Sequence, residues 1–128
     1  MHEMLGNQLF LVRNYTRAAE TLEKALRKKP KDKAIRRKLI VCYTQIGEVK
    51  KALQLFMSLA NEDIDFIINI DPIEDDCPCP EIVYDMEAQL DQNQNSVDFQ
   101  LNLGMLWLFC DIHKSIAYFK QAQKLDPQ

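Results

Sequence analysis

The chain has 128 residues, of which 47% are apolar and 27% are charged, a composition typical of a soluble globular protein with one core. Only three Gly and five Pro are present and good helix formers are plentiful, so the composition favours helix. No run of about 18 apolar residues occurs, and we therefore predict no membrane-spanning helix. The N-terminal stretch has neither a basic region nor a small-residue cleavage site, and we predict no signal peptide.

The net charge is only −3, but positive and negative charges are separated along the chain. Residues 1–60 hold 13 Lys/Arg and 5 Asp/Glu, a net charge of +8. Residues 61–128 hold 3 Lys/Arg and 14 Asp/Glu, a net charge of −11. Solvated faces of a repeat structure would show this division. It also allows an acidic and a basic partner at the two ends, or head-to-tail association of copies.

The first two predicted elements are helices over His2–Val12 and Thr16–Lys28. In the first, Leu5, Leu9 and Val12 lie at i, i+4 and i+7 and share one helical face. In the second, a small residue is expected where the two helices approach closely, and a proline after the last basic turn ends the helix. The inner stripe of the second helix is expected to consist of Ala18, Leu22, Ala25 and Leu26.

A shift of 34 residues reproduces this pattern in a second pair of helices. Gly47 stands at the turn between them, where a left-handed backbone is often needed. The matched positions are Leu5 with Leu39, Leu9 with Tyr43, Tyr15 with Val49, Ala18 with Ala52, Leu22 with Phe56 and Ala25 with Leu59.

The pattern returns in the last part of the chain, Leu101–Pro127. There Gly104 again follows a leucine, with Trp107 three residues later. The spacing of the second helix is repeated by Ser115, Phe119, Ala122 and Pro127.

The middle of the chain departs from the repeat. Phe56 and Phe119 are 63 residues apart, five fewer than two periods of 34. Pro80–Gln92 keeps an apolar stripe behind a proline suited to a first helical turn, and it is predicted as a helix. Ile67–Cys79 has a β-branched run, and Pro72, Pro78 and Pro80 lie in it or directly after it, so we predict an extended or irregular segment there in place of a first helix. The wider stretch Ile64–Pro80 interrupts the copies of the repeat, and we expect a partner-specific feature there.

The Leu-Gly pair, the aromatic residue after it and the later Ala, aromatic and Pro, all within about 34 residues, resemble the tetratricopeptide repeat (TPR) family. The resemblance implies an all-α fold, an α-solenoid of stacked antiparallel helix hairpins in a right-handed superhelix. We expect about seven helices with one irregular segment, in a single domain over residues 1–128. The expected repeats are about 1–32, 33–66, a degenerate 67–95, and 96–128. The absence of a capping helix after the last repeat suggests a fragment of a longer protein, or an edge covered by self-association.

In proteins similar to this one, the first helix of each repeat lines a concave groove that holds a peptide or a partner helix. Some of them clamp a C-terminal carboxylate with Lys, Asn and Arg. Here Glu3 stands where a Lys is needed and Lys38 where an Asn is needed, so we do not predict that activity. By position, the exposed face of the groove is expected to carry Asn7, Phe10, Arg37, Lys38, Val41, Gln45, Asn102 and Met105, with Glu3, Leu101 and Phe109 beside them.

The cysteines and the acidic run give no metal or redox prediction. Cys77 and Cys79 lack a second close pair for a zinc site, and their spacing is not the Cys-x-x-Cys of redox motifs. Without a secretory signal, these two, Cys42 and Cys110 are expected to be reduced thiols in the cytoplasm. The acidic run 71–76 lacks the Gly and alternating oxygen ligands of a calcium loop and is expected to be solvated.

The basic run 27–38 has eight Lys/Arg in twelve residues, a composition that can contact phosphates. It lies across a helix junction and has no aromatic residues in it, so we do not expect nucleic acid as a partner. No phosphate-binding Gly-rich loop, nucleophile elbow or paired metal motif is present, and the chain has only two His. We predict neither enzymatic activity nor a cofactor.

The sequence therefore predicts a protein–protein interaction scaffold that binds a peptide or partner helix in a TPR groove. The alternative is a structural self-assembly module that uses its basic N-terminal and acidic C-terminal halves, with a homo-oligomer as the product.

Overall fold

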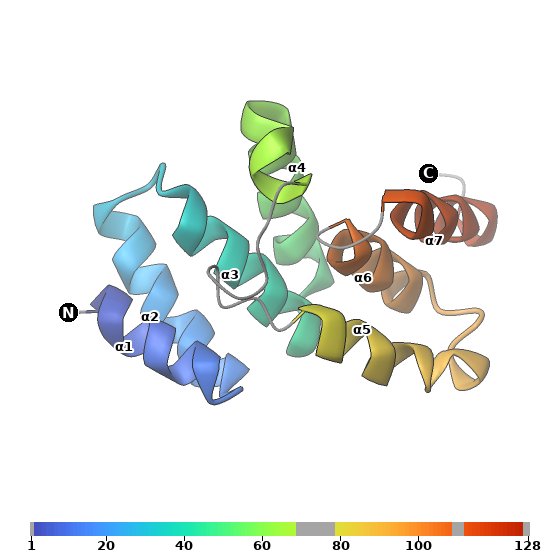
Figure 1. The fold of residues 1–128 in the computed structure, drawn as a ribbon, viewed down its shortest axis with the longest axis horizontal. Helices are drawn as coiled ribbons and strands as arrows, with labels where there is room; N and C mark the ends of the chain where they lie inside the picture. Colours follow the sequence, from blue (N-terminus) through green and yellow to red (C-terminus); the bar gives the residue numbers. More distant parts are fainter. Residues whose placement is uncertain (1, 69–78, 109–111, 127–128) are drawn as a thin grey trace. The chain divides into compact units, whose positions relative to one another are not determined.

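In a computed structural model, the chain is described over residues 2–68, 79–108 and 112–126, without the side chains of residues 79, 80 and 112. These ranges consist of helices and turns and contain no strand, which confirms the all-α prediction (Figure 1). Seven α-helices are present in them, in agreement with the predicted number. The elements are α1 (His2–Leu11), α2 (Tyr15–Lys28), α3 (Lys33–Gln45), α4 (Val49–Ile68), α5 (Cys79–Glu87), a 3₁₀ helix η1 (Leu90–Gln92), α6 (Val97–Trp107) and α7 (Ile112–Leu125).

The chain divides into two compact units, Met1–Ile64 and Asp65–Gln128. Unit 1 holds α1, α2, α3 and most of α4, and unit 2 holds α5, η1, α6 and α7. The backbone of α4 is non-helical at Asp63 (φ −159°, ψ 83°), one residue before the end of unit 1. Because each unit is compact by itself, the single domain expected over residues 1–128 stays a prediction. The four expected repeat boundaries also stay predictions.

In unit 1, α1 and α2 form a hairpin that is closely packed at Gly6. A Cβ atom at this position would lie only 2.6 Å from Cδ2 of Leu22, which is fully buried on α2. The start of α2 is capped by Asn14, whose side chain accepts a hydrogen bond from the Arg17 N–H over 3.3 Å. Two small residues therefore let the helices pack closely: Gly6 on α1 and the fully buried Ala18 on α2.

The hairpin of α6 and α7 in unit 2 has the same construction. A Cβ atom at Gly104 would lie 2.8 Å from the Phe119 ring. The hydroxyl of Ser115, on α7, donates a buried hydrogen bond of 2.7 Å to the Gly104 carbonyl. The Leu-Gly pairs that match in sequence thus mark the helix crossing in both hairpins.

Helix α3 is the most buried element of unit 1. Asp32 caps its start by accepting from the Ile35 N–H over 3.0 Å, and Gly47 follows its end with φ 83°, as expected for the turn. Lys33 pairs with Asp63 at 2.8 Å, and the buried Arg36 guanidinium pairs with Glu62 at 2.9 Å. That pairing holds the pKa of the Glu62 carboxyl below its usual range. These ion pairs connect α3 to the last turns of α4.

The predictions for the middle of the chain are partly confirmed. The helix expected over Pro80–Gln92 is present as α5, but it ends at Glu87 and is followed by η1. The irregular segment expected over Ile67–Cys79 is wrong at its first two residues, because α4 continues to Ile68. Burial of Ile67, which is fully inaccessible, outweighs the low helix propensity of β-branched residues there. Residues 69–78, with Cys77 and the acidic run, lie outside the described residues.

Candidate functional site

Side chains predicted to line a groove meet where α1 contacts α3 in unit 1. The Lys38 ammonium on α3 donates a hydrogen bond of 3.0 Å to the Asn7 side-chain oxygen on α1. The same Nζ atom lies 5.8 Å from the centroid of the Phe10 ring, within reach of a cation–π interaction. Lys38 and Asn7 are each half-buried, so ligand atoms can still reach them. Three of the predicted residues are therefore brought together from two helices.

This polar pair, Asn7 and Lys38, keeps unused hydrogen-bonding capacity. An ammonium group has three N–H donors and an Asn amide has two. Among the residues that the structure describes, the Asn7 oxygen is the one side-chain acceptor found for the Lys38 ammonium, and the Asn7 amino group has none. The pair can therefore donate to carbonyl or carboxylate oxygens of a bound molecule while its own contact is kept.

Phe10 was predicted on the exposed face of the groove, and this placement is wrong. Its side chain is 1% exposed. The ring packs edge-to-face against Tyr15, with 6.0 Å between ring centroids. Phe10 is therefore a core residue whose ring contacts the Lys38 ammonium of the polar pair.

The exposed positions predicted for α3 are also corrected in part. Arg37 and Val41 are 6% and 2% exposed, because α1, α2 and α4 all contact α3 and cover most of its surface. Gln45 is half-buried, and its amide donates a hydrogen bond of 3.2 Å to the hydroxyl of the adjacent Thr44. On α3, Lys38 and Gln45 thus remain the predicted residues that a partner can reach.

In unit 2, Asn102 and Met105 are 8% and 0% exposed, so their predicted place on an exposed face is wrong as well. Helix α6 is buried on every side from Asn102 to Trp107. A helix with apolar residues on every side is normally a core helix. The apolar residues around α6 are the sequence signal that could have predicted its burial. Leu101 is half-buried, and Phe109 lies outside the described residues.

Sequence reasoning missed an exposed apolar face on α1. Leu5 and Val12 were predicted to share a packed face with Leu9, but only Leu9 is buried, and the other two are 43% and 71% exposed. Met4 and Leu11 are 65% and 50% exposed. With Asn7 they fall at i, i+3 and i+7, in one row along the helix surface. Asn7 therefore lies between two exposed apolar side chains.

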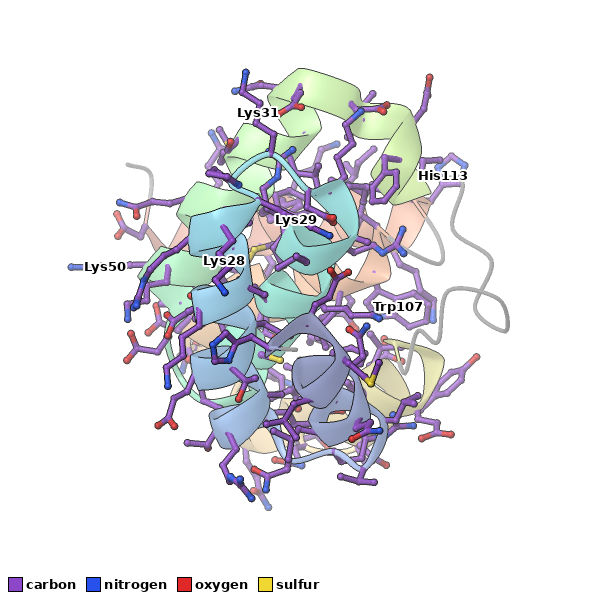
Figure 2. The ribbon with its side chains drawn as sticks, turned by 90° about the vertical axis from the view of Figure 1, so that its left-hand side faces the viewer. Lys28, Lys29, Lys31, Lys50, Trp107 and His113 are labelled. Atoms are coloured by element: carbon purple, nitrogen blue, oxygen red, sulfur yellow. The ribbon has the colours of Figure 1, made fainter. Side chains whose placement is uncertain are left out.

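The basic run divides into two parts. In its second part, Lys33, Arg36 and Lys38 bond to Asp63, Glu62 and Asn7, and Arg37 is buried. The first part is exposed: Lys28, Lys29 and Lys31 project from the end of α2 and the turn after it (Figure 2). One cation of this first part, Lys29, pairs with Glu3 of α1 at 3.2 Å.

In unit 2, a hollow of about 340 Å³ lies where η1, α6 and α7 meet, lined by Leu90, Gln94, Gln100, Ala117, Tyr118 and Gln121. The Tyr118 hydroxyl donates a hydrogen bond to the Glu87 carboxylate. Burial, and then this carboxylate, raise the pKa of Tyr118 above its usual range. Tyr118 therefore stays protonated at neutral pH.

The Lys114 ammonium lies 4.1 Å from the centroid of the Trp107 ring and 3.9 Å from Glu87. These contacts stabilise the packing of α5, α6 and α7.

The described part of the chain gives no support to a reactive cysteine. Cys42 is a buried, free thiol, and burial raises its pKa to about 12, so it is protonated at neutral pH. Tyr43 donates a hydrogen bond of 2.6 Å to Glu23, and its pKa is raised above its usual range by burial and then by that carboxylate. Cys110 and the side chains of Cys77 and Cys79 lie outside the described residues.

Within residues 2–68, 79–108 and 112–126, no group of three or more His, Cys, Asp or Glu is placed to hold a metal ion. In the same ranges, no helix has both the length and the apolar character needed to cross a membrane.

Comparison with known proteins finds a family model that matches the N-terminal part of the chain. The family model described as Tetratricopeptide repeat matches residues 9–65, which hold the end of α1, all of α2 and α3, and most of α4. A comparison with curated proteins finds no match to the chain. TPR proteins generally serve as non-enzymatic repeat scaffolds that mediate protein–protein interactions. Residues 9–65 are therefore similar to the tetratricopeptide repeat family, and this similarity covers less than half of the chain.

Proposed function

We propose that the chain is a protein–protein interaction scaffold that binds a peptide or an amphipathic helix on the surface shared by α1 and α3. The observation that carries this proposal is the polar pair, whose unused donors lie beside the exposed Met4 and Leu11. The family supports the class of partner, because TPR repeats generally mediate protein–protein interaction.

The chemistry of this surface defines the partner. An apolar side chain of the ligand would cover Met4 and Leu11, and burial of apolar area would supply most of the affinity. A backbone carbonyl or a carboxylate of the ligand would accept hydrogen bonds from Lys38 and Asn7 and fix its orientation. Gln45 offers a further amide on the same helix as Lys38. A cytoplasmic location belongs to the same proposal and is supported by the free thiol of Cys42.

The substitutions Leu11→Asp and Lys38→Glu are each expected to weaken ligand binding by about tenfold, since each removes a contact of roughly 1–2 kcal/mol. Peptides selected from a random library on the unmodified chain would supply a defined ligand. Their affinity for each variant would then be measured by isothermal titration calorimetry.

The matched control is Met57→Asp on α4. Met57 is 53% exposed, close to the 50% of Leu11, and it lies outside α1 and α3. Binding should survive this change. Selected peptides that bind the Leu11→Asp and Lys38→Glu variants as tightly as the unmodified chain would rule out this surface as the binding site.

Self-assembly is a second candidate, and the distribution of charge favours it. Residues 1–64, which form unit 1, carry 13 Lys/Arg and 7 Asp/Glu, whereas residues 65–128 carry 3 and 12. The net charges of the two units are therefore +6 and −9, and the charge boundary falls close to the unit boundary. Units of opposite charge on different copies attract each other.

If copies associate in this way, the average mass in sedimentation should rise with protein concentration at low ionic strength and fall back to the monomer as salt is added. Screening explains this dependence, because the Debye length drops from about 30 Å at 0.01 M to about 8 Å at 0.15 M salt. A monomer at every concentration in low salt would refute self-assembly and leave the α1–α3 surface unaffected.

A further inference from the structure

The exposed first part of the basic run forms a distinct surface at the end of α2, here called the basic patch. Its members are Arg27, Lys28, Lys29 and Lys31, all of them exposed. Lys29 shares one hollow with Lys28 and another with Lys31, and in Figure 2 Lys50 of α4 points outward on the left-hand side. The turn that carries Lys31 and the start of α4, which carries Lys50, lie at opposite ends of α3. Because α3 has 13 residues, these ends are roughly 20 Å apart.

Among the described residues, neighbouring negative groups compensate the basic patch only in part. The C-terminus of α2 contributes roughly half a negative charge, and Glu3 compensates Lys29 across a 3.2 Å ion pair. The carboxylate of Asp32 is directed to the N-terminus of α3, where it accepts from the Ile35 N–H. Within the described residues, Arg27, Lys28 and Lys31 have no ion pair, but Lys31 contributes to the lowered pKa of the Glu62 carboxyl and is therefore compensated in part. Positive charge is therefore available here for a partner.

The surface around Lys29 is also hollowed. One hollow, of about 100 Å³, is lined by His2, Glu3, Ala25, Lys28 and Lys29. A second, of about 470 Å³, is lined by Lys29, Pro30, Lys31 and Asp32. Pro30 is exposed and apolar, and it stands between two of the cations. The basic patch therefore combines positive charge with an apolar contact and room for side chains.

We propose that the basic patch binds an acidic protein segment in which apolar residues alternate with Asp or Glu. Carboxylates of the segment pair with Lys28 and Lys31, and an apolar side chain covers Pro30 and the aliphatic stem of Lys29. This goes beyond the proposed function, because it adds a second surface made of residues outside the polar pair.

A protein segment fits this surface better than nucleic acid does. The basic patch contains no aromatic side chain on which a base could stack, and it has a single Arg among its four cations. The chain as a whole carries a net charge of −3, which opposes a long polyanion more than a short acidic segment. The Pro30 surface also matches an apolar side chain, which a phosphate backbone lacks.

The experiment uses the full chain and a short fluorescent peptide in which Glu and Leu alternate. Anisotropy titrations would compare the unmodified chain with the variant K28E/K31E and with the control K50E/K120E. The control replaces two exposed lysines outside the basic patch and changes the net charge by the same amount. Circular dichroism would verify that both variants keep their helix content.

We expect K28E/K31E to weaken binding of the Glu–Leu peptide by at least about tenfold, since two charge pairs become like-charge contacts. K50E/K120E should change it less than about twofold, the effect of net charge alone at physiological salt. A peptide with Gln in place of Glu should bind weakly to all three proteins. A peptide selected on the α1–α3 surface, whose binding Leu11→Asp weakens, should bind K28E/K31E normally, which separates failure here from failure of the α1–α3 surface.

Three results would overturn the proposal. Equal binding by the unmodified chain and K28E/K31E would exclude the basic patch as the site. Tighter binding of a single-stranded oligothymidylate of matched charge, lost in the same variant, would identify a nucleic-acid site instead. Salt-sensitive self-association of the unmodified chain that K28E/K31E abolishes and the Glu–Leu peptide cannot displace would identify a second copy as the occupant.

Discussion

Replacement of Phe10 by alanine is expected to lower the free energy of unfolding by about 3–5 kcal/mol, the usual cost of truncating a fully buried Phe. The ring is 1% exposed and packs against Tyr15, and the Lys38 ammonium lies above it. Its removal leaves a cavity between α1 and the start of α2. Urea unfolding followed by circular dichroism would measure the loss.

The next residue of α1 provides the control. Leu11 is 50% exposed, so Leu11→Ala should cost less than about 1 kcal/mol. Comparison of Phe10→Ala with Leu11→Ala distinguishes a role of Phe10 in the core from a role in ligand binding. If Phe10→Ala left stability unchanged but abolished binding of a selected peptide, Phe10 would line the groove as the sequence suggested, and its burial in the core of unit 1 would be wrong.

Addition of a methyl group at Gly104 is the second change with a large expected effect. A Cβ atom there would lie 2.8 Å from the Phe119 ring, which is well inside van der Waals contact. The contact includes Cγ of Phe119, next to the backbone of α7, so the ring or the helix must shift and Gly104→Ala should lower the free energy of unfolding by about 1–3 kcal/mol. Trp107 is the one tryptophan of the chain and lies in α6, and its fluorescence therefore reports unfolding of unit 2.

A double-mutant cycle tests the cause. Phe119→Leu removes part of the ring that a Cβ atom at Gly104 would meet, so Gly104→Ala should cost less in the Phe119→Leu background than alone. Strict additivity of the two changes would show that the cost comes from the backbone of α6 and not from the contact with Phe119. Gly6→Ala should cost at least as much as Gly104→Ala, because a Cβ atom there would lie 2.6 Å from Cδ2 and 2.7 Å from Cγ of the fully buried Leu22.

The two proposed surfaces give unit 1 two kinds of ligand contact. Lys38 and Asn7 offer hydrogen-bond donors beside apolar side chains of α1, and the basic patch offers charge beside Pro30. Their residues do not overlap, so variants of one surface can be tested without altering the other. A scaffold with both surfaces can hold two segments of a partner, which raises the effective concentration of the second contact.

Much of the fold could be predicted from the sequence, because its signals are local. The 3.6-residue period of apolar residues gave α1, α2, α6 and α7, and Asn14 and Gly47 gave two of the boundaries. The Leu-Gly pair recurs in the sequence, but the structure was needed to show that the helices pack closely at Gly6 and Gly104. Such signals fail where burial competes with propensity, as at the end of α4, where Ile67 is buried in a helix that the sequence did not predict.

The candidate site was predicted less well. Of the eight residues assigned to the groove, Phe10, Arg37, Val41, Asn102 and Met105 are buried, and only Asn7, Lys38 and Gln45 are partly accessible. Position within a repeat tells which face of a helix a residue occupies, but not which neighbouring helix covers that face. Met4 and Leu11 are exposed beside Asn7. Their exposure could not be predicted from the sequence, because a hydrophobic pattern assigns apolar residues to the interior.

The sequence by itself determined that the chain is helical, that its helices pair, and that its cations and anions are separated, because composition and period are properties of the chain alone. Only the tertiary structure decided which members of the basic run are available. Lys33, Arg36 and Lys38 are used in bonds to Asp63, Glu62 and Asn7, while Lys28 and Lys31 are left to solvent. The physical reason is distance: the bonds of Lys33, Arg36 and Lys38 join residues 26 to 31 positions apart in the chain, which are brought together only when the helices pack.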